Sequence, residues 1–207
     1  NAAAHRLVSY WKFRKQIFGV RANMPMTLTG DGAMSREDVV GYRNCIAAAL
    51  PTDMNGRSVL YINYTHLRHL ASDEMSRLRY FFFALHVASE NELSLNEGIV
   101  VISVFLSHFE ISESDRLSAS LVVDGMPIKV HAHHVLCPFE PTNLFYANFA
   151  STMASMWGME VAKVTRLYNA CSDAERGTKI LSHAPSLRVQ DLPPALGGSW
   201  GSEAMVD

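Results

Sequence analysis

The chain has 207 residues, of which 48% are hydrophobic and 18% charged, which fits one globular domain and excludes a disordered chain. Eighteen Lys and Arg oppose twenty Asp and Glu, and no basic run occurs, so nucleic acid is not an expected partner. The three cysteines are far apart and lack the Cys-x-x-Cys spacing of a zinc or redox site, which is typical of reduced thiols in an intracellular protein.

The N-terminal residues 2–18 predict a helix that ends at Gly19. Its apolar residues fall largely on one helical side: Leu7, Tyr10, Trp11, Phe13, Ile17 and Phe18. The cations Arg6, Lys12, Arg14 and Lys15 form a basic flank. A solvated flank is the favoured interpretation, and contact with anionic lipid headgroups is the alternative.

An irregular connection precedes a second predicted helix, which spans residues 35–50 and ends before Pro51. Asp38 stands three residues after Ser35, where its carboxylate favours a helix N-terminus. A turn at 53–56 leads into a predicted strand at 58–64, which has an apolar centre.

The remaining elements alternate between strands and helices. Ser72, Asp73 and Glu74 cap a third helix with a buried stripe up to Ala88. Residues 99–106 form an apolar run broken by Ser103, which indicates a strand covered on both faces, as in a parallel sheet. A helix at 112–123, strands at 127–133 and 161–168 and a helix at 172–182 follow. The alternation predicts an α/β fold with a mostly parallel sheet flanked by helices.

Residues 141–159 contain no charged side chain and predict a helix with large side chains on one side and small ones on the other. Phe145, Phe149, Met153 and Met156 share one arc, with Trp157 at its edge, and small Ala and Ser residues lie opposite. A membrane span would need about 20 predominantly apolar residues, and the Thr, Asn and Ser side chains here argue against one. From the residues alone, a core helix and a wall over an apolar cavity are both open.

The pair His131 and His133 could hold one metal ion, since residues two apart on a strand share a face. A third ligand at a recognisable spacing does not accompany them, so histidines at the end of a strand are the favoured interpretation. A nucleophile at the Gly-x-Ser-x-Gly match, residues 197–201, would need an acid and a His further along the chain, but only six residues follow it and the last His is upstream at His183. No phosphate-binding Gly-rich loop occurs. We therefore expect no cofactor, no metal and no catalytic residue.

Residues 53–61, Asp-Met-Asn-Gly-Arg-Ser-Val-Leu-Tyr, resemble the opening of the CRAL-TRIO lipid-binding domain, where an Asp-x-x-Gly-Arg-Pro-Val turn leads into the first strand. Ser58 stands where that family usually has Pro. Residues 191–198, Asp-Leu-Pro-Pro-Ala-Leu-Gly-Gly, resemble the family's closing Leu-Pro-x-x-Leu/Tyr-Gly-Gly signature, which is the more specific match. The resemblance covers roughly residues 36–200.

The resemblance implies an apolar cavity for one lipid or other small hydrophobic ligand, closed by a gate helix at 141–157. The residues expected at the cavity and gate are Phe145, Phe149, Met153, Met156, Trp157, Val101, Phe105, Ile128 and Val130. The phosphatidylinositol-transfer branch carries a Pro-Glu-Arg before the strand and a Lys in the gate. This chain has Asp124, Gly125, Met126 and Pro127 and an uncharged helix there, so phosphoinositide is not an expected ligand.

With the resemblance, these observations predict a non-enzymatic protein that binds a single hydrophobic molecule or phospholipid, and transfer of that ligand is a further expectation. We expect an N-terminal helix and connection at 1–34, the lipid-binding domain at 35–200 and a tail at 201–207. A monomeric, cytoplasmic protein with transient peripheral membrane contact is expected, since no charged-then-apolar leader opens the chain. The alternatives are a metal-assisted hydrolase using His131 and His133 and a non-catalytic interaction module.

Overall fold

A five-stranded sheet organises the protein, and its strands lie side by side in the order of the sequence. The computed structural model describes residues 2–43, 47–65, 73–106, 125–126, 128–138, 149, 151–152, 154 and 158–201. The strands are β1 (Ala47–Leu50), β2 (Val59–Asn63), β3 (Ile99–Val104), β4 (Val130–Cys137) and β5 (Thr165–Asn169). β1 is antiparallel to β2, and β2 to β5 are parallel, which confirms the predicted α/β class with a mostly parallel sheet.

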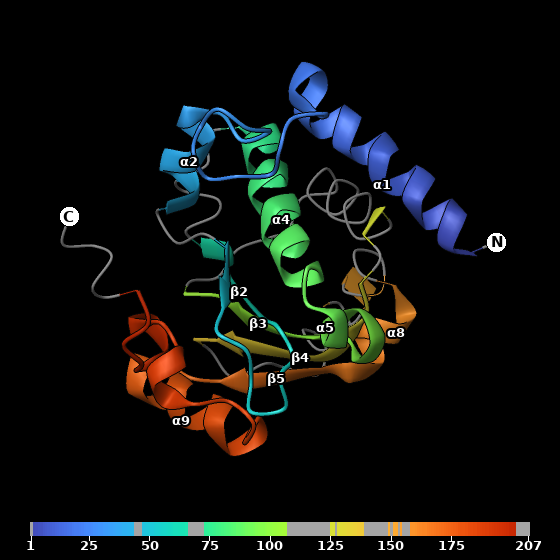
Figure 1. Ribbon diagram of the computed structural model, residues 1–207. Helices are drawn as coiled ribbons and strands as arrows, with labels where there is room; N and C mark the ends of the chain where they lie inside the picture. Colours follow the sequence, from blue (N-terminus) through green and yellow to red (C-terminus); the bar gives the residue numbers. More distant parts are fainter. Residues whose placement is uncertain are drawn as a thin grey trace.

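Helices cover both faces of this sheet (Figure 1). On one side lie α1 (Ala2–Phe18), α2 (Arg36–Arg43) and α4 (Glu74–Ser89), and on the other lies α9 (Asp173–His183). The shorter elements are η1 (Gly19–Arg21), α5 (Glu92–Glu97), α8 (Met159–Val164), η2 (Val189–Asp191) and η3 (Pro194–Leu196). Among the described residues, no helix is both long and apolar enough to cross a bilayer.

Each face of the sheet carries its own apolar core. Leu60, Ile62 and Val101 pack with α4 and the inner side of α1, and Val100, Ile102 and Leu136 pack with α9 and the segment that follows it. β3 is buried along its whole length, as its continuous apolar run predicts. We call the side that faces α4 the α4 face; alternation along the strands also places Ser103, His133 and Thr165 on it.

Side-chain caps start the helices where the sequence predicts them. The Asp73 carboxylate accepts a hydrogen bond from the Ser76 amide at the start of α4, and the Ser172 hydroxyl accepts one from the Glu175 amide at the start of α9. At α2 the bond is reciprocal: the Ser35 amide donates to Asp38 Oδ2 (3.0 Å) and the Asp38 amide donates to Ser35 Oγ (3.1 Å). The predicted starts of these three helices are therefore confirmed.

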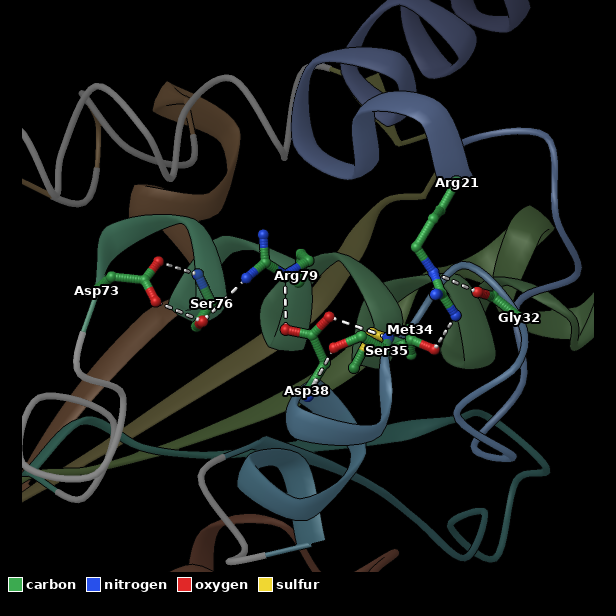
Figure 2. Close-up of polar contacts among 8 residues, drawn as sticks. All are labelled: Arg21, Gly32, Met34, Ser35, Asp38, Asp73, Ser76 and Arg79. Carbon is green, nitrogen blue, oxygen red and sulfur yellow. Dashed lines mark hydrogen bonds and ion pairs between the residues drawn. The ribbon is translucent and has the colours of Figure 1, made fainter.

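Figure 2 shows how polar contacts join the N-terminal region to α4. Asp38 of α2 is buried, and its Oδ1 accepts a hydrogen bond from Arg79 Nε of α4 at 2.6 Å. The Arg21 guanidinium donates to the carbonyls of Gly30 (2.7 Å), Gly32 (2.8 Å) and Met34 (3.2 Å), which fixes the connection between η1 and α2. The connection is thus a loop held in place by the hydrogen bonds of Arg21 and joined to a helix at each end.

Three predicted elements differ from the structure. The second helix ends at Arg43, and Ala47–Leu50 is strand β1, because antiparallel pairing with β2 outweighs the helix propensity of three alanines. Residues 161–164 belong to α8, and only the second half of the predicted 161–168 strand forms β5. β4 begins at Val130 rather than at 127 and continues to Cys137. The predicted helix at 112–123 lies outside the described residues.

Candidate functional site

Five of the nine residues predicted at the cavity and gate share one apolar cluster on the α4 face. Val101, Phe105 and Phe149 are buried in it, and Ile128 and Val130 are half-buried and pack against it. Phe145, Met153, Met156 and Trp157 lie outside the described residues. Within the predicted gate segment, the described residues 149, 151, 152 and 154 are helical.

An aromatic group stands where parallel strands β2 and β3 end. Tyr64 follows β2 and Phe105 follows β3, and their rings stack with centroids 4.8 Å apart and planes 6° apart. Phe149 meets Phe105 edge to face at 6.1 Å. Phe149 of the predicted gate segment thus touches the carboxyl end of β3. Ligands of open α/β sheets bind outside the carboxyl ends of the strands, at a point where the strand order reverses, and the order of the described strands of this sheet does not reverse.

A row of polar side chains crosses the otherwise apolar α4 face beside this aromatic group. Ser103 Oγ of β3 lies 2.8 Å from His133 Nε2 of β4, and His133 Nδ1 lies 3.0 Å from Thr165 Oγ1 of β5. Ser103 and His133 are at most 1% exposed. Thr165 Oγ1 in turn donates to the Val161 carbonyl at 2.8 Å. We call Ser103, His133 and Thr165 the polar row.

The hydrogen bonds of the polar row fix its protonation. Because the Thr165 hydroxyl uses its proton on the Val161 carbonyl, its oxygen accepts from His133 Nδ1–H. Nε2 is then the unprotonated nitrogen and accepts the Ser103 hydroxyl proton. Burial, with a smaller effect of His134, lowers the pKa of His133 to about 3, so the imidazole is neutral.

A hydroxyl that donates to a neutral imidazole is also the arrangement of serine nucleophiles. Here a threonine hydroxyl, not a carboxylate, orients the imidazole. Ser103 is also fully buried, so a substrate cannot reach its oxygen in this arrangement. The contacts of the polar row thus fit a buried polar group beneath the apolar side chains of the α4 face better than a site of acyl transfer.

The opposite face of the sheet holds a second histidine group. His134 Nδ1 lies 3.1 Å from the Tyr168 hydroxyl, and the Tyr168 ring lies 4.5 Å from that of His183 on α9. Burial, with smaller effects of His183 and Arg166, lowers the pKa of His134 to about 4. This cluster connects β4, β5 and α9.

The turn that carries the Asp-x-x-Gly-Arg match is held by a buried ion pair. Asp53 Oδ2 accepts from Arg57 Nε (3.0 Å) and Nη2 (2.8 Å), and Asp53 Oδ1 accepts from the amides of Asn55 and Arg57. Burial raises the pKa of the Asp53 carboxyl, but the hydrogen bonds from Arg57 outweigh this and hold that pKa below its usual value. The motif therefore fixes the entry into β2.

The closing match, residues 191–198, packs against α9. Leu192 and Leu196 are buried in the core on that face, and Arg176 Nε donates to the Ala195 carbonyl at 3.1 Å. A Cβ on Gly177 would lie 2.3 Å from the Leu196 carbonyl oxygen, and one on Gly198 would lie 2.0 Å from that of Leu192. Glycine is thus required by close backbone approach at both positions.

The contacts of His131 and His133 argue against a shared metal position. His131 Nε2 lies 2.5 Å from Arg57 Nη1, so the Arg57 guanidinium stands where a metal ion bound to Nε2 would lie. Both ring nitrogens of His133 have protein partners. In the described part of the chain, no three His, Cys, Asp or Glu residues are grouped as a metal site requires. Ser199 of the Gly-x-Ser-x-Gly match follows η3 rather than a strand, so it lacks the strand–turn–helix context of a nucleophile.

Sequence reasoning did not identify the polar row. The sequence offered two signals for it: Ser103, the hydroxyl that interrupts the apolar run of β3, and His133, which was considered only as a metal ligand or a strand-end histidine. Comparison of the chain with protein-family models gave no matching family, and comparison with curated proteins gave no similar protein. The function is therefore inferred from the residues and their geometry alone.

Proposed function

We propose that the protein is a CRAL-TRIO-like domain that binds one lipid or other small hydrophobic molecule and exchanges it with membranes. The ligand lies in an apolar cavity on the α4 face, and residues 141–157 form the helix that gates it. Affinity comes from apolar burial, on the order of 25 cal/mol per Å² removed from water. No covalent step, cofactor or metal takes part.

The observation that carries this proposal is the contact of Phe149 with Phe105. It joins the uncharged segment to the carboxyl end of β3. Phe149 is 7% exposed, so its ring already covers apolar surface of the α4 face. An uncharged segment that places a large aromatic ring on such a face suits a gate over a hydrophobic ligand.

Two further features support the resemblance. The Asp53–Arg57 pair holds the turn into β2, and Gly177 and Gly198 allow the closing segment to pack against α9. Both matched motifs thus have residues with definite contacts in this fold. The polar row supplies hydroxyl and imidazole groups beside Phe105, where the polar end of a mostly apolar ligand could be oriented once the gate moves.

The direct test is extraction of the protein, purified from cells, with organic solvent and analysis of the extract. We expect a lipid near one mole per mole of protein. If no lipid is recovered and none is taken up from vesicles, the interaction module becomes the better explanation. Metal analysis of the parent and of a variant with both His131→Gln and His133→Gln tests the hydrolase: stoichiometric zinc that the double variant loses would contradict our proposal.

The gate is tested with Phe149→Asp. A charge at this position is unfavourable against both ligand and bilayer, so lipid exchange between vesicles should fall at least tenfold while circular dichroism still shows a folded protein. Met159→Asp is the matched control, because Met159 is 64% exposed at the start of α8 and its replacement should leave exchange unchanged. If Phe149→Asp unfolds the protein instead, the segment is an ordinary core helix.

A further inference from the structure

Helix α1 is anchored to the rest of the protein by its inner side. Phe13, Ile17 and Phe18 are buried, and the Phe18 ring meets Phe82 of α4 with centroids 5.5 Å apart. The Tyr10 hydroxyl lies 3.2 Å from His86 Nδ1 of α4. Figure 1 shows α1 on the α4 side of the sheet, with its N-terminal end at the periphery of the molecule. The helix is therefore a fixed part of the surface.

The outer side of α1 exposes large apolar residues, including Leu7 and Trp11, which the sequence places on one helical side with the buried Phe13 and Ile17. Leu7 is 59% exposed, Val8 68% and Trp11 44%. These three residues lie within one helical turn and form a continuous strip, with Lys12 and Lys15, both exposed, one turn further along it. We call Leu7, Val8, Trp11, Lys12 and Lys15 the α1 strip.

Trp11 is held in place although nearly half of it is exposed. Its ring meets Tyr10 edge to face at 5.6 Å, and the Arg14 guanidinium lies 5.0 Å from the ring centroid. Arg14 is itself buried and donates to the Tyr10 hydroxyl and the Met24 carbonyl. A tryptophan ring that packs against the protein on one side and is exposed to solvent on the other is suited to insertion at a membrane–water interface.

Positive charge is concentrated in the N-terminal segment that contains α1, and negative charge in the rest of the chain. Residues 1–30 hold five of the 18 Lys and Arg and none of the 20 Asp and Glu, so this segment carries +5 and residues 31–207 carry −7. The hydrogen bonds of Arg14 and Arg21 described above go to neutral oxygens rather than to carboxylates. The apolar strip thus lies in a positive field on an otherwise acidic protein.

We infer that the α1 strip is the surface with which this protein docks on anionic lipid bilayers. An exposed helical surface with apolar residues along its centre and lysines beside them is typical of a helix that lies in the headgroup region of a membrane. Lys12 and Lys15 then reach anionic headgroups, while Leu7, Val8 and Trp11 enter the apolar boundary. The inference rests on the proposed function in one respect only: lipid exchange is the reason why the protein would bind a bilayer.

The test is co-sedimentation of the full chain with vesicles of phosphatidylcholine plus phosphatidylserine and with vesicles of phosphatidylcholine alone. We expect binding to the anionic vesicles that weakens with added salt. Trp11→Ser should weaken it about tenfold. Lys12→Gln with Lys15→Gln should weaken it about 25-fold, since each basic residue near such a surface contributes about fivefold. Met54→Ser is the control: Met54 is 62% exposed but bonded through its amide to Ser186, beyond α9, and its replacement should have no effect.

Thermal melts check that the variants are folded, and solvent extraction of each variant measures its bound lipid separately. Loss of vesicle binding with unchanged lipid content supports the α1 strip independently of the cavity. Binding that the α1 variants leave unchanged, or equal binding to uncharged vesicles, would overturn the inference. So would a dimer that Trp11→Ser dissociates together with an absence of vesicle binding, because the strip would then be a protein–protein contact.

Discussion

Acidification should destabilise this protein through two histidines buried on opposite faces of β4. The pKa of His133 is lowered from 6.5 to about 3 and that of His134 from 6.5 to about 4, chiefly by burial. Between those values and 6.5 the unfolded chain binds more protons than the folded protein, so the free energy of unfolding falls as the pH falls. This stability is complete above pH 6.5 and is lost progressively below it.

The size of the effect follows from the fraction of protonated histidine in the unfolded chain. When the pH falls from about 7.5 to about 5, protonation stabilises a histidine of ordinary pKa in the unfolded chain. The gain corresponds to about 1.5 pH units at about 1.4 kcal/mol per unit. Each buried histidine that stays neutral therefore costs about 2 kcal/mol of stability, and the pair costs about 4 kcal/mol. The result depends little on the folded pKa, provided that it lies well below 5.

Chemical denaturation followed by circular dichroism at a series of pH values measures this effect. His133→Gln should remove about 2 kcal/mol of the pH dependence, whatever it does to stability at neutral pH. Val135→Ala is the control, because it removes buried apolar volume from the same strand and should shift the curve downward in parallel. If the curves of the parent and His133→Gln are parallel between about pH 7.5 and about pH 5, the histidine is not held neutral by burial.

Two further substitutions test the matched motifs by their effect on the free energy of unfolding. Asp53→Asn leaves the buried Arg57 guanidinium without its anionic partner and should cost about 3–5 kcal/mol, whereas Asp31→Asn, in an exposed pair with Arg36, should cost less than about 1 kcal/mol. Gly177→Ala places a methyl group against the Leu196 carbonyl and should lower the melting temperature by several degrees, about 1–3 kcal/mol. A variant as stable as the parent in either case would show that the contact is not needed.

The helices and central strands were predictable because their signals are local. Asp73 and Ser172 are side-chain caps, and the apolar run of β3 is long enough to need cover on both faces. β1 was not predictable, since Ala47, Ala48 and Ala49 favour a helix until β2 offers them an antiparallel partner. Val161 and Val164 resemble a strand locally, but they follow Gly158, whose positive φ of 85° starts α8 instead.

The candidate site was only partly predictable because it depends on register. Phe105 and Phe149 could be proposed from apolar periodicity and resemblance, since both are large residues in apolar segments. The polar row could not, because its members come from three strands and meet only through the pairing of β3 with β4 and β4 with β5. An irregularity between Ile99 and Val100 shifts that pairing, and one residue of shift changes which side chains are neighbours.

Because the strands lie in the sheet in the order in which they are synthesised, the sheet can grow at one edge as the chain emerges from the ribosome. Each new strand covers the edge left by the one before it. Until β5 arrives, that edge is β4, whose residues from His133 to Cys137 are all buried in the finished protein. β5 itself is largely half-exposed and carries Arg166 outward, which is a safer terminal edge. Chains that stop at Cys137 should therefore aggregate during translation, whereas chains that reach Trp200 should not, and comparing the soluble yield of the two truncations would show whether β5 acts as the closing strand.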